Sequence, residues 1–420
     1  MQTKDKKFGK SKSCQICGSN KLQKILSLGS TGLCDSLLSL KQVLSGKEPN
    51  YPLDLFRCPK CYLIQLNYVV NNKKVFHLNY PYKSGITKRL TSLLYSTSLY
   101  IKKNFKLPKN PLVIDIGSND GTLLEGFKKN KFQVLGVEPT NIAKLANKKG
   151  IPTLQRFFDT SAAKLIEKKY KKKAQVITGT NIFAHINKLD SFMKGVKKII
   201  DKKNGLFVTE SHYMVDIVND LQYDSIYHEH LRFYLLHSLD VLLKSYGFKI
   251  IDAVRIPNYG GSIRVIASLN ANLKAKKSVS ILKNYERKNG FYGSRKYLNF
   301  KKDVFKSKAM LVDLLSKLKR NNNRIVGIGC PGRSITLLSF CGINKDLLDY
   351  IAEQKTSLKL NYYTPNSHLK IIDEKYFFKN QPEYALLLSW HYKDSIMKNL
   401  KSKGYKGKFI IPLPYPKIVS

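Results

Sequence analysis

The stretch of residues 111–143 reads PLVIDIGSNDGTLLEGFKKNKFQVLGVEPTNIA, and its pattern of apolar residues and glycines indicates the type of fold. Its first part, Leu112 to Ile116, is a short apolar run rich in β-branched residues, which predicts a buried strand. Beyond a glycine-containing loop the apolar residues recur at helical spacing, and residues 133–137 predict a second strand that ends at Glu138. The stretch therefore predicts a strand, a loop, a helix and a second strand.

The loop after the first strand predicts a binding site for a nucleoside cofactor. Glycines let the backbone approach a ligand, and a carboxylate that closes the next strand can accept hydrogen bonds from both ribose hydroxyls. Loops that bind dinucleotides carry further glycines, which admit a pyrophosphate. This loop carries Asn119 and Asp120 instead. Because an acidic loop repels phosphate and attracts a cation, it favours S-adenosylmethionine over NAD. A glycine turn without a ligand is the third interpretation. The expected cofactor-binding residues are Asp115, Gly117, Ser118, Asn119, Asp120, Glu138 and Pro139.

The length and composition indicate a globular protein. With 420 residues, 43% of them hydrophobic, the chain can form two or three domains with sizeable cores. It has no run of about 18 apolar residues, and its N-terminal MQTKDKKFGKSKSC lacks the apolar segment of a secretion signal. We therefore expect a soluble, cytoplasmic protein without a membrane partner.

The formal net charge of +45 would ordinarily suggest a nucleic-acid or membrane-surface partner. The lysines, however, are scattered through nearly every predicted helix, with one dense cluster at residues 168–173. A lysine-rich coding composition produces the same solvated faces, so we expect no nucleic-acid partner. A positive field would still attract an anionic, nucleotide-linked substrate.

The seven cysteines do not suggest a disulfide framework, because their number is odd and the chain reads as cytosolic. Four of them form two C-x-x-C motifs, CQIC and CPKC, which can place four thiolates around Zn²⁺. A redox dithiol is the alternative. A closed site of four cysteines has no open position, so this zinc should be structural. The expected ligands are Cys14, Cys17, Cys58 and Cys61, and the other three cysteines are expected in the core.

A regular α/β alternation follows the N-terminal segment. Residues 174–180 predict a strand that is followed by Asn181 and His185. Since the carboxyl end of a central parallel strand faces the ligand crevice, Asn181 is expected to bind the cofactor. His185 is either a catalytic group or a structural histidine. Upstream, Tyr80 and Tyr82 flank a proline, and both aromatic packing and a site role fit them.

The segment DSIYHEHL, residues 224–231, has the highest density of potentially catalytic side chains in the chain. Two imidazoles around a carboxylate could bind a metal, but the motif lacks the three-residue interval that places two histidines on one helix face. Acid/base work is the second interpretation, because histidine titrates near neutral pH and a neighbouring glutamate or tyrosine can orient it. A surface loop without a catalytic role is the third.

The remaining segments predict how the chain is completed. Strands at 249–256 and 262–269, joined by PNYGG, predict an antiparallel hairpin at the end of the sheet, which is the arrangement of class I methyltransferases. Residues 271–323 are helical in pattern and predict a bridge. A second α/β unit then begins with a strand at 324–328 and the turn GCPGR, where glycine and arginine could hold a phosphate or simply form a packing turn.

The order of motifs resembles the sugar C-methyltransferase family of deoxysugar pathways, typified by enzymes that methylate C3 of TDP-linked 3-amino-4-ketosugars. The matching motifs are the two C-x-x-C pairs, DIGSNDGTLL, GVEP, NIFAH, IYHEHL, YGGSIRV, G-x-G-x-P and a terminal PLP. The resemblance implies a monomer with a zinc-binding domain at 1–78, an S-adenosylmethionine-dependent methyltransferase domain at 79–272 and a C-terminal Rossmann-like domain at 273–420 that helps hold a nucleotide-linked ketosugar.

The resemblance also implies roles for individual residues. His230 resembles the base that removes a proton from the sugar carbon. The other residues expected in catalysis are Tyr227, Glu229, His185 and Tyr80. Those expected to contact the substrate are Tyr82, which replaces Tyr80 if the match shifts by two, His228 in the histidine motif, and Arg264 in YGGSIRV.

Simple chemistry agrees with this assignment. A proton next to a ketone is acidic enough for a positioned histidine, because the remaining charge spreads onto the carbonyl oxygen as an enolate. The carbanion carbon can then attack the methyl group of the sulfonium in line. Two rival functions stay open at this stage: a zinc-ribbon RNA methyltransferase, and a cofactor-binding homologue without catalysis.

Overall fold

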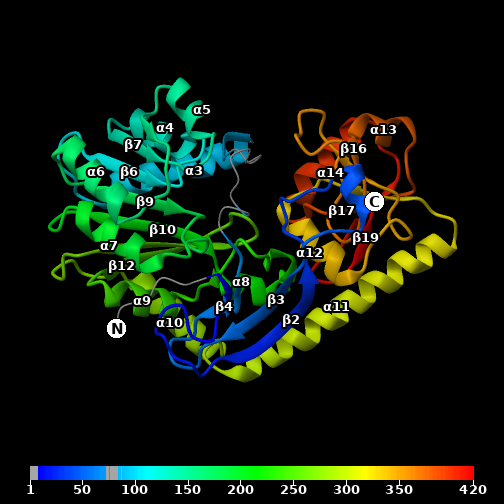
Figure 1. Cartoon of the computed structure of the whole chain (residues 1–420), viewed down its shortest axis with the longest axis horizontal. Helices are drawn as coiled ribbons and strands as arrows, with labels where there is room; N and C mark the ends of the chain where they lie inside the picture. The colour runs from blue at the N-terminus through cyan, green and yellow to red at the C-terminus, as the bar shows by residue number, and fades with distance from the viewer. Residues whose placement is uncertain (1–7, 72–74, 76–83, 87) are drawn as a thin grey trace.

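The computed structural model describes residues 8–71, 75, 84–86 and 88–420. Figure 1 shows a central α/β unit at one end, a C-terminal α/β unit at the other, and N-terminal strands that run between them. In these described parts of the chain, no helix is both long enough and apolar enough to span a membrane.

The central sheet is made of β6 (Leu112–Ile116), β7 (Gln133–Val137), β8 (Thr153–Leu154), β9 (Val176–Thr180), β10 (Leu206–His212), β12 (Lys249–Ile256) and β13 (Ser262–Ser268). Its strand order is β12-β13-β10-β9-β6-β7-β8. The strands from β8 to β10 pair in parallel, and β13 is antiparallel to both of its neighbours. The expected parallel sheet closed by a hairpin is confirmed.

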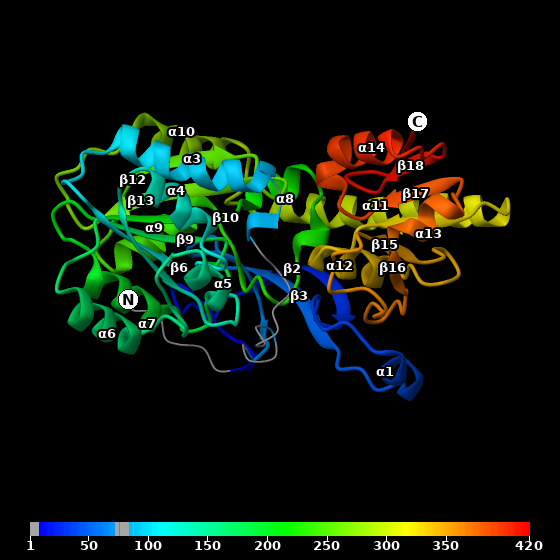
Figure 2. The same ribbon diagram turned by 90° about the horizontal axis from the view of Figure 1, so that it is seen from above.

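Helices cover both faces of the central sheet: α3 (Lys88–Asn104), α4 (Thr122–Lys129), α5 (Ala143–Lys148), α6 (Thr160–Tyr170), α7 (Leu189–Ile199), α8 (Met214–Asn219) and α9 (Leu236–Ser245), with short 3-10 turns η1 (Ser84–Ile86) and η2 (Tyr223–Ser225). Figure 2 shows α3 on one side and α6 and α7 on the other. Because side chains alternate along a strand, Leu112 and Ile114 belong to the core under α6 and α7, whereas Val113 packs with α3 and α4. Burial on both faces explains why β6 reads as a continuous apolar run.

The N-terminal unit contains β1 (Gly9–Lys10), β2 (Gln23–Thr31), α1 (Leu40–Ser45), β3 (Tyr51–Arg57), β4 (Ile64–Leu66) and β5 (Tyr68–Val69). The strands β4 and β5 are separated by the single residue Asn67. Its main sheet has the order β11-β4-β3-β2, and β11 (Arg232–Phe233) comes from the central unit. The strand directly after IYHEHL therefore completes the sheet of the N-terminal unit.

The C-terminal unit contains β14 (Ile325–Ile328), α12 (Gly332–Cys341), β15 (Ile351–Glu353), β16 (Ile371–Asp373), α13 (Glu374–Lys379), β17 (Tyr384–Leu387), η3 (Trp390–Tyr392), α14 (Lys393–Ser402), β18 (Lys408–Ile411) and β19 (Lys417–Val419). The sheet has the order β16-β15-β14-β17-β18-β19, and all pairs are parallel except the last. This agrees with the expected Rossmann-like unit.

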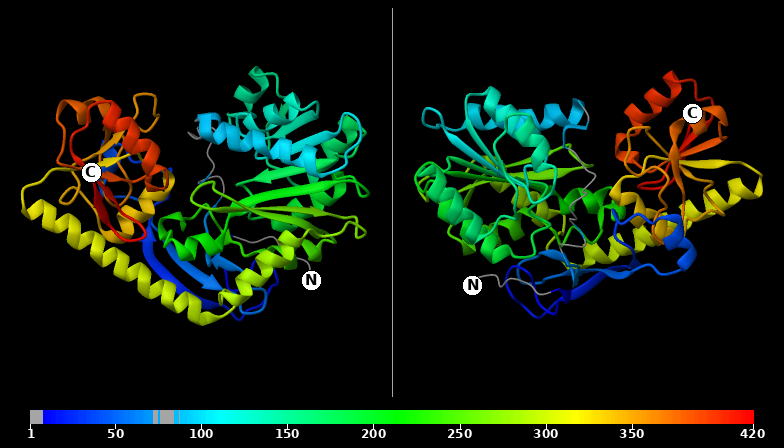
Figure 3. Two further views of the ribbon diagram at one scale, coloured as in Figure 1. Left: turned by 180° about the vertical axis from the view of Figure 1, so that it is seen from behind. Right: turned by 45° about the horizontal axis from the view of Figure 1, so that its top comes forward.

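The expected helical bridge consists of α10 (Lys277–Lys288) and α11 (Ser294–Arg320). Figure 3 shows α11 passing beneath the central unit and on to the C-terminal unit. At 1.5 Å per residue its 27 residues span about 40 Å. Its buried residues, among them Phe300, Leu311 and Leu315, recur at helical spacing, so α11 presents one continuous apolar stripe to the other units.

Candidate active site

The loop after β6 is shaped for close contact with a ligand. Gly117 has a φ of +73° and Asn119 a φ of +50°, and a Cβ atom at Gly117 would collide with the side chain of Ile182. The amide of Gly117 donates to the carbonyl of Val137 at 2.7 Å, so the end of β7 holds the loop in place. Only glycine fits this left-handed, crowded position.

Glu138 closes β7 and is buried beside the same loop. Its Oε2 accepts from the amide of Asn119 at 3.0 Å, and its Oε1 accepts from the amide and the hydroxyl of Thr140 at 2.9 and 2.7 Å. A carboxylate has about four lone-pair sites. Glu138 therefore remains able to accept hydrogen bonds from a ribose while the protein fixes its orientation.

Acidic groups gather beneath the loop. Asp115 accepts a hydrogen bond from the Thr178 hydroxyl at 2.6 Å. Burial raises its pKa to about 7, against the lowering effect of Thr178, and the charges of Glu138 and Glu210 raise it further. Asp120 accepts from the Thr122 hydroxyl at 2.7 Å. A site of this kind favours a cationic ligand.

Two buried polar atoms in this region fit a bound cofactor. Ser118 Oγ and Asn181 Oδ1 have no hydrogen-bond partner within the described part of the protein. Asn181 has a φ of +56°, and its amide donates to the carbonyl of Glu210 at 2.9 Å. Buried polar groups need partners, so the groups present fit S-adenosylmethionine. Pro139, half-buried after Glu138, completes the expected set.

His230 lies at the carboxyl ends of β9 and β10, where it lines a cavity of about 10 Å³. Its Nδ1 is 3.1 Å from the carbonyl oxygen of Ser225, and its Nε2 is 3.1 Å from Tyr227 Oη. The carbonyl can only accept, so Nδ1 carries the proton, and the lone pair of Nε2 accepts a hydrogen bond from the Tyr227 hydroxyl. The other lining residues are Asn181, Ala184, His185, Ser211, His212, Arg232 and Phe233.

The structure brings three imidazoles together in this cavity. The ring centroids of His185 and His212 each lie 4.7 Å from that of His230. Burial lowers the pKa of His185 to about 4 and that of His212 to about 3. Burial, His212 and His185 also hold the pKa of His230 well below its ordinary value, with a further contribution from the charge of Arg333. All three rings are therefore neutral at pH 7.

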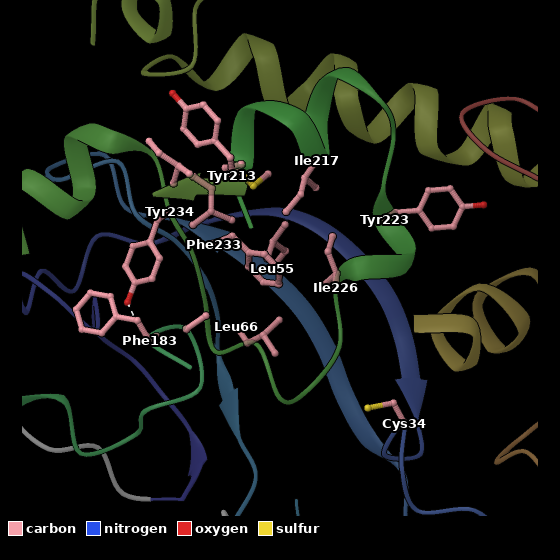
Figure 4. Close-up of a cluster of buried hydrophobic side chains, with 14 of the residues drawn as sticks. Cys34, Leu55, Leu66, Phe183, Tyr213, Ile217, Tyr223, Ile226, Phe233 and Tyr234 are labelled. Atoms are coloured by element: carbon pink, nitrogen blue, oxygen red, sulfur yellow. Dashed lines mark hydrogen bonds between the residues drawn. The ribbon is translucent and has the colours of Figure 1, made fainter. Parts of the chain in front are cut away.

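Figure 4 shows how the loop that carries His230 is anchored in the core. Ile226 and Phe233, on either side of the loop, lie beside Leu55 and Leu66 of the N-terminal sheet, and all four are fully or almost fully buried. The hydroxyl of Tyr234 donates to the carbonyl of Phe183 at 3.3 Å. Apolar packing thus fixes both ends of the polar segment.

Glu229 points toward the N-terminal unit. The Cys34 thiol donates to its Oε1 at 3.0 Å. Burial raises the pKa of Glu229 to about 8, and the nearby charge of Asp35 raises it further. Lys359 of the C-terminal unit pairs with Asp35 at 3.1 Å. Glu229 therefore sits where all three units meet, and it is largely protonated at neutral pH.

Two residues expected to contact the substrate make protein contacts. His228 Nε2 lies 3.1 Å from the carbonyl oxygen of Tyr51, and burial lowers its pKa to about 4. Arg264 Nε donates to Glu210 at 2.5 Å, across the register of β10 and β13. His228 thus faces β3, and Arg264 is engaged in a buried ion pair. Tyr80 and Tyr82 lie outside the described residues.

Some site residues were not assigned from the sequence. His212 is the last residue of β10, and its position at the carboxyl end of a central parallel strand was the available signal. Cys34 offered none, because it belongs to no motif. Arg333 was considered as a phosphate ligand, yet its Nη2 donates to Asp224 at 2.8 Å.

The two C-x-x-C motifs form one cluster of four buried thiols. Cys14 Sγ lies 3.4 Å from Cys61 Sγ, and Cys17 Sγ lies 3.6 Å from Cys58 Sγ. Zinc–sulfur bonds of about 2.3 Å require sulfur atoms about 3.8 Å apart in a tetrahedron. The two sulfur–sulfur distances are therefore slightly shorter than those of a zinc-bound cluster. The residues fit a structural Zn²⁺ ion.

The two halves of the cluster have matching backbone turns. The amide of Gly18 donates to the carbonyl of Cys14 at 3.1 Å, and the amide of Tyr62 donates to that of Cys58 at 3.0 Å. Gly18 and Tyr62 both have left-handed φ values, of +71° and +58°. Gly18, directly after the first motif, therefore has its structural counterpart in Tyr62, directly after the second, and the ring of Tyr62 stacks on that of Tyr292.

Comparisons with known proteins give matches along nearly the whole chain. Three family models match: a zinc binding domain at residues 14–76, a methyltransferase domain at 93–253 and a C-methyltransferase C-terminal domain at 257–414. The C-methyltransferase NovU of Streptomyces niveus is 29% identical over 410 residues, covering 97% of this chain and 96% of that protein.

Solved structures with some likeness include a magnesium protoporphyrin IX methyltransferase of Synechocystis PCC 6803 with bound S-adenosylmethionine (13% identity, TM-score 0.32, 42% of this chain and 78% of that one). Another is a methyltransferase of Aquifex aeolicus (15% identity, TM-score 0.30, 42% of this chain and 97% of that one).

The three family models follow one another in the order of the three structural units. The central sheet has the strand order and the closing hairpin of a class I methyltransferase. The chain therefore belongs to the C-methyltransferase family, and it is an S-adenosylmethionine-dependent C-methyltransferase.

Proposed function

We propose that this protein methylates a carbon atom next to the ketone of a nucleotide-linked ketosugar, with His230 as the base. The observation that carries the proposal is the geometry of His230. Its Nδ1 is occupied by the Ser225 carbonyl, so Nε2 is the unprotonated nitrogen, which accepts from Tyr227 until a substrate replaces that contact, and His230 lines the cavity. That cavity also contains Asn181, which follows the strand next to the cofactor loop.

The pKa of His230 suits a group that must begin the reaction unprotonated. Because the pKa lies well below 6.5, the ring is neutral throughout the physiological range. Taking a proton from carbon creates an imidazolium in a buried site, which is costly on its own. The enolate formed at the same time carries the opposite charge and offsets that cost.

Neighbouring groups can orient the substrate and stabilise the charge on its oxygen. Tyr227 Oη lies 3.1 Å from His230 Nε2 and can move its hydrogen bond to the substrate. Glu229, largely neutral because its pKa is raised to about 8, can donate to a keto oxygen or accept from a sugar amine. His185 lies beside His230, with the two ring centroids 4.7 Å apart. S-adenosylmethionine, when bound, supplies an electrophilic methyl group.

The three-unit architecture supports a large substrate. The parallel sheet of the C-terminal unit has the form of nucleotide-binding folds, and we propose that this unit holds the nucleotide. The net charge of +45 favours an anionic diphosphate. Tyr80, Tyr82, His228 and Arg264 stay predictions as substrate or catalytic contacts, and the Cys14 cluster is proposed to hold one structural zinc ion.

Deuterium exchange tests the role of His230. The protein is incubated in D₂O with S-adenosylhomocysteine and a panel of TDP- and GDP-linked ketosugars, and mass spectrometry follows deuterium uptake next to the ketone. Methyl transfer is measured in parallel with S-adenosylmethionine. We expect His230→Ala to lose at least about a hundredfold in both rates, because general base catalysis contributes about 10²–10⁴-fold.

His368→Ala is the matched control, since His368 is an exposed histidine paired with Glu48 in another part of the protein. It should exchange and methylate at the wild-type rate. If His230→Ala exchanges as fast as wild type, the assignment of the base is wrong. If the wild-type protein acts on none of the sugars but methylates RNA, or binds the cofactor without any transfer, one of the rival functions is correct.

A further inference from the structure

A buried carboxylate joins the C-terminal unit to the loop of the base. Asp224, fully buried, lies one residue before Ser225. Arg333 Nη2 donates to its Oδ1 at 2.8 Å, and Trp390 Nε1 donates to its Oδ2 at 2.8 Å. Both carboxylate oxygens are thus engaged by side chains of the C-terminal unit.

Further hydrogen bonds from the same helix surround this contact. Arg333 Nη2 also donates to Gln222 Oε1 at 3.2 Å, and Arg333 Nη1 donates to the carbonyl of Tyr259 at 3.2 Å. One turn along α12, Thr336 Oγ1 donates to the carbonyl of Ile226 at 3.0 Å. The first turns of α12 therefore bind the chain before and after Ser225.

Ser225 links this contact to the base. Its carbonyl oxygen accepts the Nδ1 proton of His230 at 3.1 Å, and this bond decides which ring nitrogen is free. We propose that Arg333 and Trp390 are positioning residues that set the orientation and tautomer of His230, acting through Asp224 and the Ser225 carbonyl. The inference rests on the proposed function of His230, but its central claim concerns a ring whose state can be measured without any substrate.

The contact between Arg333 and Asp224 also influences the protonation of His230, because Arg333 carries a positive charge. The groups that face His230 are Tyr227 on its own loop, His185 after β9, His212 at the end of β10, and Arg333 on α12. Tyr227 has a pKa raised well above its ordinary value by burial, so it is neutral, as are both histidines. Two cations lie near this set: Arg232 of β11, which lines the same cavity, and Arg333, whose charge helps to keep His230 unprotonated.

The experiment measures the tautomer and the titration midpoint of the His230 imidazole directly. The full-length protein is labelled with ¹⁵N-histidine, and the imidazole nitrogens are titrated by NMR, with the His230 signals assigned by their loss in His230→Ala. In the wild-type protein we expect one tautomer, protonated at Nδ1, and a midpoint well below pH 6.5. Methyl transfer is measured as a function of pH on the same variants.

Charge and geometry are separated by three substitutions. Arg333→Gln removes the cation, so the His230 midpoint should rise toward pH 6.5 and the tautomers should mix. Arg333→Lys keeps a cation without the paired hydrogen bonds, so the midpoint should stay low while the tautomers mix. Asp224→Asn leaves Arg333 without its counter-charge, so the midpoint should stay low or fall further. If the substitutions only weakened the contact between the C-terminal and central units, the His230 midpoint would instead rise in all three variants.

Trp390→Phe provides a milder test if the charge variants do not fold, because it keeps an aromatic ring and removes only the indole N–H. We expect kcat to fall about tenfold with little change in KM, since misplacement of a catalytic group by 1 Å can cost about a hundredfold. Asn366→Ala is the matched control. It removes a contact between units, to Thr31 and Gly32, that does not involve the loop, and it should leave the His230 titration unchanged.

The inference is wrong if Arg333→Gln and Trp390→Phe both fold and keep the wild-type tautomer and midpoint of His230. That outcome does not depend on catalysis, so it is distinct from a failure of the proposed function. Conversely, if the ring responds as expected while wild-type protein transfers no methyl group to any ketosugar, the positioning contact is present and the substrate assignment is wrong.

Discussion

Asp115 is the residue whose ionisation couples most directly to cofactor binding. Its pKa is raised from 3.8 to about 7 because it is buried and lies close to Glu138 and Glu210. In the unfolded chain it would release its proton near pH 4. The unliganded protein therefore loses free energy of unfolding as the pH rises from about 4 to about 7, and a bound cation should recover that loss.

We expect the affinity for S-adenosylmethionine to increase with pH. The sulfonium and ammonium groups favour the ionised form of Asp115, so binding near pH 7 should release a fraction of a proton. The Kd should fall by up to about tenfold between pH 6 and pH 8, because one pKa unit corresponds to a factor of ten. Calorimetry in buffers of different ionisation enthalpy measures both the affinity and the released proton.

Asp115→Asn cannot ionise, and it should bind the cofactor more weakly with most of this proton release abolished. Thr178→Val is the companion variant, because it removes the hydrogen bond that lowers the pKa of Asp115. It should move the pH dependence to higher values. Equal proton release by wild type and Asp115→Asn would show that another group is responsible.

At the scale of single elements, β11 couples the N-terminal unit to the loop that carries His230. It is a two-residue strand that belongs to the central unit and pairs with the N-terminal sheet. Arg232 pairs with Gln65. The preceding residue, Leu231, accepts at its carbonyl from the amide of Leu66 at 3.0 Å and donates from its amide to Ala184 at 3.0 Å. Gln15, which lies inside the first C-x-x-C motif, donates to the carbonyls of Leu66 and Leu231 at 2.9 and 3.5 Å. The cysteine cluster thus holds the residue next to His230.

Removal of the metal should therefore loosen the loop of the base as well as the N-terminal unit. Wild-type protein should contain one zinc ion per chain after dialysis, and Cys58→Ser should contain less. In hydrogen exchange we expect the amides of residues 230–233 to lose protection together with those of residues 64–66. Catalysis should fall with the zinc content, because the orientation of His230 is lost.

Cys341→Ser is the control, since Cys341 is a buried cysteine of α12 outside the cluster. Its zinc content and the exchange of residues 230–233 should match wild type. A folded, metal-free protein with full protection of β11 would contradict both the structural role of zinc and its link to the loop.

At the scale of the whole molecule, the three units are joined through buried contacts. Lys359, Asp35 and Glu229 bring one residue from each unit together. The segment after β2 is also fixed to the C-terminal unit, where Gly32 donates its amide to Asn366 Oδ1 at 2.8 Å. Because these contacts link the three units, we expect the units to unfold in a single transition.

The single tryptophan reports on this coupling. Trp390 is buried against Asp224, at the contact between the C-terminal and central units. We expect its fluorescence and the far-UV circular dichroism to change together in denaturant, because separation of the units and loss of secondary structure are one event. The same two probes should coincide in thermal unfolding if the transition is reversible.

Lys359→Met is informative here, because it leaves the carboxylate of Asp35 without its partner at the junction. It should destabilise the protein by about 1–3 kcal/mol, the cost of leaving a polar group without its partner, because both side chains of this pair are only partly buried. A tryptophan transition well before the loss of secondary structure in wild-type protein would show that the C-terminal unit separates independently.

Much of the fold could be predicted from local patterns. The expected strands at 112–116 and 133–137 agree with β6 and β7 residue for residue, and the strand expected at 249–256 agrees with β12. Alternation, helical spacing and glycine positions act over a few residues, so they can be read from the chain directly. Other boundaries moved where tertiary contacts intervened: the strand expected at 174–180 begins only at Val176, and Ala174 pairs with Ile200 instead.

Local patterns in the chain were enough to predict the strands and loops, the spacing of Glu138 after the cofactor loop, and the two cysteine pairs that meet in space. The partners of the base emerge only from the packing of the three units: Arg333 and Trp390 bind Asp224, Cys34 binds Glu229, and β11 completes another unit's sheet. These partners lie more than 100 residues apart in several cases. They meet because the apolar faces of separate units pack together, and no local pattern encodes which polar groups that packing brings within hydrogen-bond distance.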